Sequence, residues 1–225
     1  MTENLSFLGE TMQIFAKAAV FDFDGTLVDS MPTWSEKMLR LLKLQGIEPP
    51  KGLVTKIATL GDEGTLDYFE KSFPLVWTRE KMKREMDEYA LPRYANEIPL
   101  KDGVKEYLQA LKTAGVQVYL LTASPHKMFE PALKRLGVLS LFDSAWSSDD
   151  FALPKSNPQI YLNLAKTIGV LPSEIAFFDD NIGAIESAKK AGLKTVAVYD
   201  KTGEEYITQM KEAADFYAYS LKDLL

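Results

Sequence analysis

The sequence predicts an α/β protein: a doubly wound parallel sheet into which an all-helical segment is inserted. Two observations carry this prediction. Short, almost continuously apolar segments alternate with stretches whose apolar residues recur every three or four positions, as buried parallel strands and their covering helices require. Between residues 31 and 98 this alternation stops, and a series of helical patterns follows without a convincing strand.

Each predicted strand ends at a polar or turn-forming group. The strands are expected at residues 18–23, 116–122, 175–178 and 195–198. The first runs into Asp22-Phe23-Asp24-Gly25-Thr26, the second ends at Thr122, and the third is followed by Asp179-Asp180-Asn181. In doubly wound sheets the chemistry takes place at the carboxyl ends of the strands, so we expect the active residues there.

The predicted helices have recognisable ends. Those between the strands are expected at 103–112, 158–168 and 184–191, each with a glycine just beyond it. In the insertion, Thr33-Trp34-Ser35-Glu36 has the pattern of a capping box and predicts a helix that ends near Gly46. Further helices are expected at 53–60, 64–73 and 78–91, while residues 1 to about 13 are interpreted as an extension or a frayed end.

Composition excludes several classes of protein. The 225 residues exceed the ~150 typical of one domain, which suits one core with a sizeable insertion. A net charge of −6 supplies no basic footprint for nucleic acid. The absence of cysteine excludes disulfides, thiolate zinc sites and cysteine nucleophiles, and the single histidine, His126, excludes a histidine-rich metal site. No apolar run approaches a membrane span and the N-terminus lacks a secretory pattern, so we expect a cytoplasmic protein.

The first chemical cluster is the pair Asp22 and Asp24. Two residues at positions i and i+2 of an extended segment point the same way, and Gly25 allows the chain to turn sharply behind them. An ordinary strand end with an aspartate turn would also fit these residues taken alone.

The second cluster, Asp179-Asp180, favours a catalytic interpretation over an ordinary strand end. It also follows a buried strand, so the four carboxylates of both clusters are expected at one edge of the sheet. Two like charges ~4 Å apart repel by about 4 kcal/mol at an effective dielectric constant of ~20. Such a group needs a cation or raised pKa values, and carboxylates without His or Cys select Mg²⁺ over zinc. Capping of the following helix would explain one of these acids, but not both.

Two further residues complete the predicted site. Thr122 ends the second strand with a hydroxyl at the same edge. Lys155 lies in a turn flanked by Pro154 and Pro158, before the helix that leads to the acidic strand. An ammonium beside clustered acids suits a site for an anionic substrate, although each residue taken singly has an ordinary structural explanation.

In chain order these motifs resemble the four motifs of the haloacid dehalogenase superfamily. The match runs from Asp22-x-Asp24-Gly25-Thr26 through Thr122 and Lys155-x-x-Pro158 to Asp179-Asp180, and covers about residues 18–221. The branch of phosphoglycolate phosphatases and β-phosphoglucomutases is the most similar. The resemblance implies a Rossmann-like core domain of residues 1–30 and 99–225, with a helical cap domain of residues 31–98.

The resemblance also implies roles for four side chains. Asp22 would be the nucleophile that forms an aspartyl-phosphate, and Asp24 would be general acid to the leaving alcohol and then general base for water. Thr122 would donate a hydrogen bond to a phosphoryl oxygen, and Lys155 would offset negative charge.

It further implies a magnesium site and substrate contacts. Asp22, the main-chain carbonyl of Asp24, Asp180 and, directly or through water, Asp179 would hold Mg²⁺. Ala123 and Ser124, directly after the threonine motif, would contact the substrate. The expected partner is a small phosphorylated metabolite, with no nucleic acid and no membrane, bound by a monomer or weak homodimer.

Alternatives stay open within this resemblance. Asp24 favours phosphate monoesters, because the superfamily's dehalogenases and phosphonatases lack an acid there. The mutases carry a histidine where this chain has Trp34, which argues against a sugar-phosphate mutase. In a receiver module the acidic pair precedes the phosphorylated aspartate, whereas in this chain the pair Asp179-Asp180 follows Asp22. A catalytically idle binding protein is a further alternative, but it would not need every acid of the motifs. The polar stretch 59–64 is either a specificity loop facing the site or an ordinary connection between helices.

Overall fold

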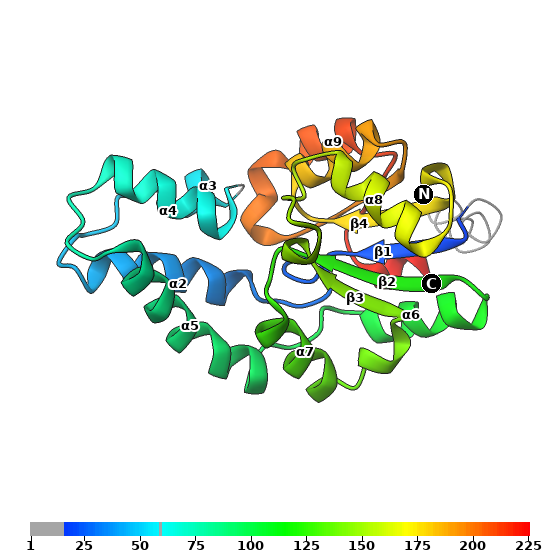
Figure 1. The fold of residues 1–225 in the computed structure, drawn as a ribbon, viewed down its shortest axis with the longest axis horizontal. Coiled ribbons are helices and arrows are strands. Elements are labelled where there is room, and N and C mark those ends of the chain that lie inside the picture. The colour runs from blue at the N-terminus through cyan, green and yellow to red at the C-terminus, as the bar shows by residue number, and fades with distance from the viewer. Residues whose placement is uncertain (1–15, 59) are drawn as a thin grey trace.

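The computed structural model describes residues 16–58 and 60–225, so the predicted N-terminal extension lies outside the described residues. The described chain forms a six-stranded sheet whose neighbouring strands are all parallel, in the order β3-β2-β1-β4-β5-β6 (Figure 1). The strands are β1 (Ala18–Phe21), β2 (Gln117–Thr122), β3 (Ser144–Ser147), β4 (Ile175–Asp179), β5 (Lys194–Val198) and β6 (Phe216–Ala218).

Strand β1 lies at the centre of the sheet, and its side chains alternate between two hydrophobic cores. Ala19 and Phe21 pack in one core, whereas Ala18 and Val20 pack in the other. All four are fully buried, because helices cover both faces of the sheet. A parallel sheet of this kind needs apolar residues on both faces, which explains the continuous apolar run in the sequence.

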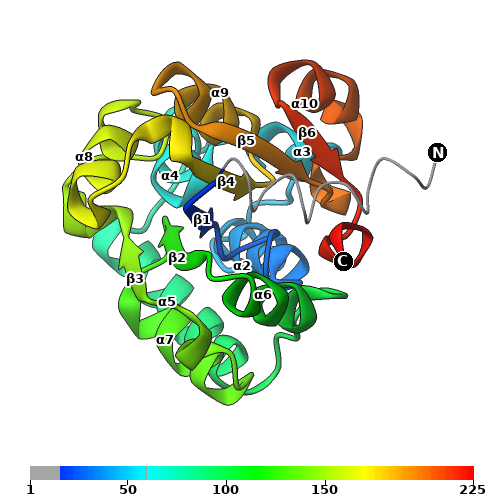
Figure 2. The ribbon, with the colours of Figure 1, turned by 90° about the vertical axis from the view of Figure 1, so that its right-hand side faces the viewer.

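Helices cover the two faces of the sheet in separate layers (Figure 2). One layer holds α6 (Val104–Thr113) and α7 (His126–Arg135), and the other holds α8 (Gln159–Ile168), α9 (Ile182–Lys190) and α10 (Ile207–Ala213). This is the predicted doubly wound α/β fold, and the fold class is confirmed.

The inserted segment forms a separate group of helices on one side of the sheet (Figure 1). They are α2 (Met31–Lys43), α3 (Leu53–Ile57), α4 (Gly61–Ser72) and α5 (Arg79–Asn96). They enclose a third hydrophobic core, which includes Met38, Leu42, Leu66 and Phe69. Two chain segments connect this group to the sheet and lie side by side, since Asp29 N–H donates to the carbonyl of Pro99.

Several details differ from the sequence prediction. The capping box at Thr33 is wrong: α2 begins at Met31, and Ser30 precedes it without capping it through its side chain. The stretch 60–64 is not a loop, because α4 begins at Gly61. Strands β3 and β6 and helices α7 and α10 were not predicted: β3, β6 and α10 are short, and α7 carries Pro131 inside it. Among the described residues, no helix combines the length and apolar character needed to cross a bilayer.

Candidate active site

The predicted nucleophile lies at the carboxyl end of β1. Asp22 N–H donates to the carbonyl of Phe178, which continues the pairing of β1 with β4 and brings Asp22 beside the acids that end β4. The chain then turns at Gly25, whose φ of +75° lies in the left-handed region. A Cβ at this position would lie 2.4 Å from Oδ2 of Asp180, so only glycine fits the turn and leaves room for that carboxylate.

Lys155 joins the acids of two strands. Its ammonium lies 2.5 Å from Oδ1 of Asp22 and 2.7 Å from Oδ2 of Asp179. The lysine side chain is 11% exposed, the Asp22 side chain 7% and the Asp179 side chain 0%, so the charges are removed from water together. Oδ1 of Asp179 also accepts the N–H of Asn181 at 2.7 Å, so both oxygens of Asp179 have donors.

Asp180 is held differently from Asp179. Its Oδ1 accepts the hydroxyl of Thr26 at 2.9 Å. Capping of helix α9 is done by Asn181, which accepts the N–H groups of Gly183 and Ala184. Neither acid of the pair therefore serves as the cap of α9, which removes the structural alternative for this motif.

The electrostatics of the cluster follow from burial and crowding. Burial raises the pKa of Asp22 to about 7, with the charges of Asp179 and Asp24 acting in the same direction and Lys155 acting against them. Burial, followed by the charges of Asp179 and Asp22, raises the pKa of Asp180 well above its usual range. Burial alone would lower the pKa of Lys155, but Asp179 and Asp22 raise it. One ammonium thus faces an excess of carboxylates.

The arrangement suits a hard divalent cation. One carboxylate oxygen from each of Asp22, Asp179 and Asp180 lies within 4.8 Å of the others. The buried Oδ1 of Asp22 accepts no well-oriented hydrogen bond from the described residues, although the ammonium of Lys155 lies close to it. Oxygen ligands and an excess of negative charge are features that favour Mg²⁺.

The carboxylate of Asp24 accepts hydrogen bonds from three hydroxyls. Oδ1 accepts Ser30 Oγ at 2.6 Å and the phenol of Tyr94 at 2.5 Å, and Oδ2 accepts Ser124 Oγ at 2.5 Å. Tyr94 lies in α5, so the inserted segment contributes one of the three donors, and Ser30 directly precedes that segment. Burial, followed by the charge of Asp24, raises the pKa of Tyr94, which therefore remains a hydrogen-bond donor.

Residues 122–124 form the edge of the site next to β2. Thr122 is 1% exposed, and its Oγ1 accepts the N–H of Ser124 at 3.0 Å, which leaves the hydroxyl proton free to donate. Ser124, predicted as a substrate contact, donates to Asp24, and the neighbouring Ala123, also predicted as one, is exposed. The structure thus brings the predicted acids, Thr122, Ser124 and Lys155 to one sheet edge.

Two groups of residues at the site were missed by the sequence interpretation. Tyr94 and Ser30 hold Asp24, yet a tyrosine in a helix and a serine before one carry no specific signal. Lys101 donates to the carbonyls of Gly25 at 2.5 Å and Tyr199 at 2.6 Å, and so braces the turn behind Asp24. Nothing in its sequence position distinguishes Lys101 from a surface lysine.

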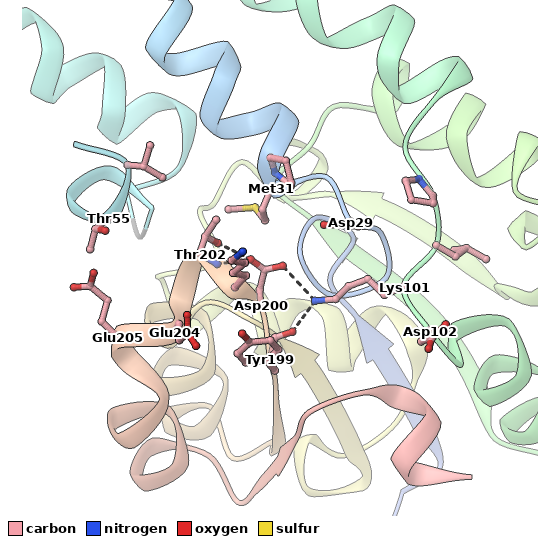
Figure 3. A pocket seen from close by; sticks show the side chains of 15 residues that line it. Asp29, Met31, Thr55, Lys101, Asp102, Tyr199, Asp200, Thr202, Glu204 and Glu205 are labelled. Carbon is pink, nitrogen blue, oxygen red and sulfur yellow. Dashed lines mark hydrogen bonds and ion pairs between the residues drawn. The ribbon is translucent and has the colours of Figure 1, made fainter. Parts of the chain in front are cut away.

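Lys101 also lines a cavity of about 1060 Å³ (Figure 3). In Figure 3 its ammonium points to Tyr199 and Asp200, while Thr55 of α3 and Glu205 lie across the opening. None of the predicted catalytic residues Asp22, Asp24, Thr122 and Lys155 lines this cavity.

Comparison with known proteins agrees with this geometry. The model of the haloacid dehalogenase-like hydrolase family matches residues 16–192, and the chain belongs to this family. The chain is similar to YhcW of Bacillus subtilis (strain 168), a phosphatase by name, with 30% identity over 93% of this chain and 97% of the relative. It is 27% identical to hexitol phosphatase B of Escherichia coli (strain K12), over 80% of this chain and 82% of that protein.

A solved structure from Haemophilus somnus 129pt, described as a predicted phosphoglycolate phosphatase, has the same fold. Its TM-score is 0.77 at 25% identity, over 93% of this chain and 96% of the other. Family, relatives and fold together identify the chain as a phosphatase of the haloacid dehalogenase type, that is, a phosphoric monoester hydrolase.

Proposed function

We propose that this protein is a Mg²⁺-dependent phosphatase of small soluble phosphomonoesters that works through an aspartyl-phosphate. One observation carries the proposal: two aspartates two residues apart have separate environments. Asp22 lies among the carboxylates and Lys155, whereas three hydroxyls hold Asp24. Different surroundings for two neighbouring carboxyl groups are typical of a nucleophile and an acid–base group that divide the work.

Asp22 is assigned the nucleophilic role. A carboxylate oxygen of Asp22 would attack phosphorus in line, and the bond from phosphorus to the alcohol oxygen would break. Lys155 neutralises part of the charge of Asp22 and of the phosphoryl group, and the free hydroxyl proton of Thr122 is available for a phosphoryl oxygen.

Asp24 is assigned the proton transfers. In the first step its carboxyl group would give a proton to the departing alkoxide, and in the second it would take a proton from the water that attacks the aspartyl-phosphate. Ser30, Tyr94 and Ser124 fix the position of this group. A proton donor for the leaving group is needed for alcohol esters, which supports monoester hydrolysis.

The proposed metal ligands are Asp22, Asp180, the main-chain carbonyl of Asp24 and, through water, Asp179. Asp179 is the weakest candidate for direct binding, because both of its oxygens already accept hydrogen bonds. When bound, Mg²⁺ would supply the positive charge that lets an anionic carboxylate approach an anionic phosphate.

We propose that residues 31–98 form a cap domain over a core of residues 1–30 and 99–225, and that closure of the cap excludes water. The hydrogen bond from Tyr94 to Asp24 and the packing of α5 against α7 support this arrangement. We also propose that the protein is located in the cytoplasm and is a monomer or weak homodimer. Trp34 donates to Asp62 and offers no base, which supports hydrolysis over a mutase reaction.

The experiment is to trap the intermediate. Asp24→Asn incubated with Mg²⁺ and p-nitrophenyl phosphate should release nitrophenol in a burst and then accumulate phosphorylated Asp22, because dephosphorylation lacks its base. Mass spectrometry of peptides locates the added phosphate. A parallel sample with EDTA should stay unmodified. Steady turnover without any phosphorylated peptide would contradict the covalent mechanism.

A further inference from the structure

One ammonium joins segments that are far apart in the sequence. Lys101 lies on the segment through which the chain returns from the inserted helices to the sheet, between α5 and α6. Its Nζ donates to the carbonyl of Gly25 at 2.5 Å, to the carbonyl of Tyr199 at 2.6 Å and to Oδ2 of Asp200 at 3.3 Å. A lysine ammonium has three donors, so these contacts use all of them. We call this set of three contacts the Lys101 brace.

The Lys101 brace is anchored at the end of β5. Tyr199 and Asp200 directly follow this strand, and Figure 3 shows the ammonium pointing to both of them. Oδ1 of Asp200 accepts the N–H of Thr202 at 2.9 Å and its hydroxyl at 2.6 Å, which fixes the carboxylate. The Asp200 side chain is 5% exposed and that of Lys101 20%. Lys101 therefore holds the carbonyl of Gly25 from a fixed point of the core.

The carbonyl that Lys101 holds is next to a proposed metal ligand. That ligand is the main-chain carbonyl of Asp24, which belongs to the peptide before Gly25, whereas the held carbonyl belongs to the peptide after it. Only the φ and ψ angles of Gly25 separate these two planar peptides, so holding one limits the orientation of the other. Glycine is the residue with the greatest backbone freedom, and Gly25 has a φ of +75°. The turn therefore depends on external contacts for its shape.

The same turn makes room for the carboxylate of Asp180. A Cβ at Gly25 would lie 2.4 Å from Oδ2 of Asp180, so the turn and this carboxylate lie close together and a displaced turn would also move Asp180. The N–H of Gly25 donates to the carbonyl of Val28 at 3.1 Å, which holds one side of the turn. On the other side, no second donor to the carbonyl of Gly25 is found among residues 16–58 and 60–225 besides Lys101.

We propose that Lys101 is a positioning residue, which keeps the turn at Gly25 in the shape that the Mg²⁺ ligands Asp24 and Asp180 require. This inference rests on the proposed Mg²⁺-dependent function. It gives Lys101 no contact with the substrate and no proton transfer. Loss of Lys101 should therefore weaken metal binding and leave the chemical step nearly unchanged once Mg²⁺ is saturating.

The charge of Lys101 alone would have the opposite effect. Burial is the main cause of the raised pKa of Asp180, and of the two charges in the brace Asp200 raises this pKa whereas Lys101 lowers it. A positive charge that acts on Asp180 in this way opposes the binding of a second cation. Loss of Lys101 would tighten Mg²⁺ binding if its charge decided the outcome, and weakens it if its position does. The two roles predict changes of opposite sign.

The test measures Mg²⁺ binding by Lys101→Met through protein stability. Urea unfolding of the metal-free protein is repeated over a series of Mg²⁺ concentrations. The gain in the free energy of unfolding depends on the ratio of Mg²⁺ concentration to Kd, so it reports Kd separately from the stability of the metal-free variant. We expect Kd to rise at least about ten-fold, an effect typical of groups that orient metal ligands. At saturating Mg²⁺, kcat for p-nitrophenyl phosphate should stay within about three-fold of the wild type.

A double variant and a matched control separate position from charge. Lys101→Met leaves the buried carboxylate of Asp200 without its ion pair, which destabilises the fold. Lys101→Met, Asp200→Asn restores the net charge of the wild type, and the amide oxygen can still accept the N–H of Thr202. It should show the same rise in Kd, and it decides the test if the single variant does not fold. Lys201→Met is the control: Lys201 lines the same cavity and is exposed, so solvent screens its charge and Kd should change less than about two-fold.

The outcomes separate this inference from the proposed function. Mg²⁺ binding by the double variant that is as tight as in the wild type, or tighter, would overturn the positioning role of Lys101. The same rise in Kd for Lys201→Met, or a kcat that stays low at saturating Mg²⁺, would overturn it as well. Failure of the wild type to hydrolyse p-nitrophenyl phosphate with Mg²⁺ would instead overturn the proposed function, because the brace is intact in the wild type.

Discussion

Two buried lysines, Lys155 at the sheet edge and Lys37 in the inserted segment, have different surroundings. Lys155 faces Asp22 and Asp179, with Asp180 close by, so negative charge exceeds positive charge at the sheet edge. Lys37 faces one acid, Asp62, and the pair is balanced. The first arrangement calls for a further cation and the second does not. The sheet edge therefore carries an excess of negative charge, whereas the charges of Lys37 and Asp62 in the insertion balance.

The physical cost of the two arrangements differs as well. Like charges ~4 Å apart in a partly buried site cost about 4 kcal/mol per pair, so the sheet edge is strained until a cation binds. A buried ion pair with additional hydrogen bonds, such as that of Lys37, roughly breaks even. The excess of like charge lowers the stability of the sheet edge, whereas the balanced ion pair does not lower the stability of the insertion.

The variant Asp22→Asn is the most direct test of the role of the sheet edge in this comparison. The amide has nearly the same shape but is not a nucleophile, so turnover of p-nitrophenyl phosphate should fall by at least about 10⁴-fold. Urea unfolding of the metal-free variant should show no loss of stability, since the change removes a carboxylate whose pKa burial raises. Retention of more than a few per cent of the activity would show that Asp22 does not attack phosphorus.

The link between the two regions is tested by Tyr94→Phe. This change removes one of three hydrogen bonds to Asp24, and should lower kcat about ten-fold for an alkyl ester such as sorbitol 6-phosphate. The loss should be smaller for p-nitrophenyl phosphate, whose leaving group needs little protonation. Tyr89→Phe is the control, because it removes a hydroxyl from the same helix that does not bond Asp24. Equal losses for both esters would mean that Tyr94 acts on the fold and not on proton transfer.

The excess charge at the sheet edge is tested by Asp180→Ala. In EDTA the variant should be more stable than the wild type by about 1 kcal/mol, because one repelling carboxylate is gone at the cost of its bond to Thr26. With substrate, the Mg²⁺ concentration for half-maximal activity should rise sharply. Denaturant melts with and without Mg²⁺ measure both effects. A metal-free variant less stable than the wild type would mean that Asp180 serves the fold.

The sequence predicted the sheet edge better than the insertion, for a physical reason. Strands and their polar ends are local patterns, and parallel pairing brings Asp22, Thr122 and Asp179 together without further information. The family resemblance covered these same residues. Nothing local predicts that Tyr94 reaches Asp24 across 70 residues of sequence.

The absence of long-range contacts from local sequence patterns also explains the wrong predictions in the insertion. Asp62 and Glu63 looked like part of an exposed connection, but both lie in the first turn of α4, where the buried ammonium of Lys37 holds the partly exposed carboxylate of Asp62. Helix α2 also begins two residues before Thr33, because Ser30 donates to Asp24 and the chain already turns at Met31. The contact of Lys37 with Asp62 joins residues 25 positions apart, and a single sequence does not record it.

The smallest expected effect comes from a third charged cluster, which is exposed. His126 bonds Glu130 through Nδ1 at 2.6 Å and Asp150 through Nε2 at 2.8 Å, and its side chain is 42% exposed. The hydrogen bond to Glu130, followed by that to Asp150, raises the pKa of His126. A raised folded-state pKa stabilises the protein fully below the unfolded value of about 6.5, and this stabilisation is lost as the pH rises through the folded-state value.

His126→Gln should therefore lower the free energy of unfolding more at pH 5.5 than at pH 8.5. Solvent screening limits the difference to about 0.5 kcal/mol. Urea melts of wild type and variant at the two pH values measure it, and activity at pH 7 should stay the same because His126 lies outside the proposed catalytic groups. A larger loss at pH 8.5 would show that His126 contributes through packing on Phe129 and not through its charge. In that case, the difference in burial between this cluster and the ion pairs of Lys155 and Lys37 would not explain how much each ion pair contributes to the free energy of unfolding.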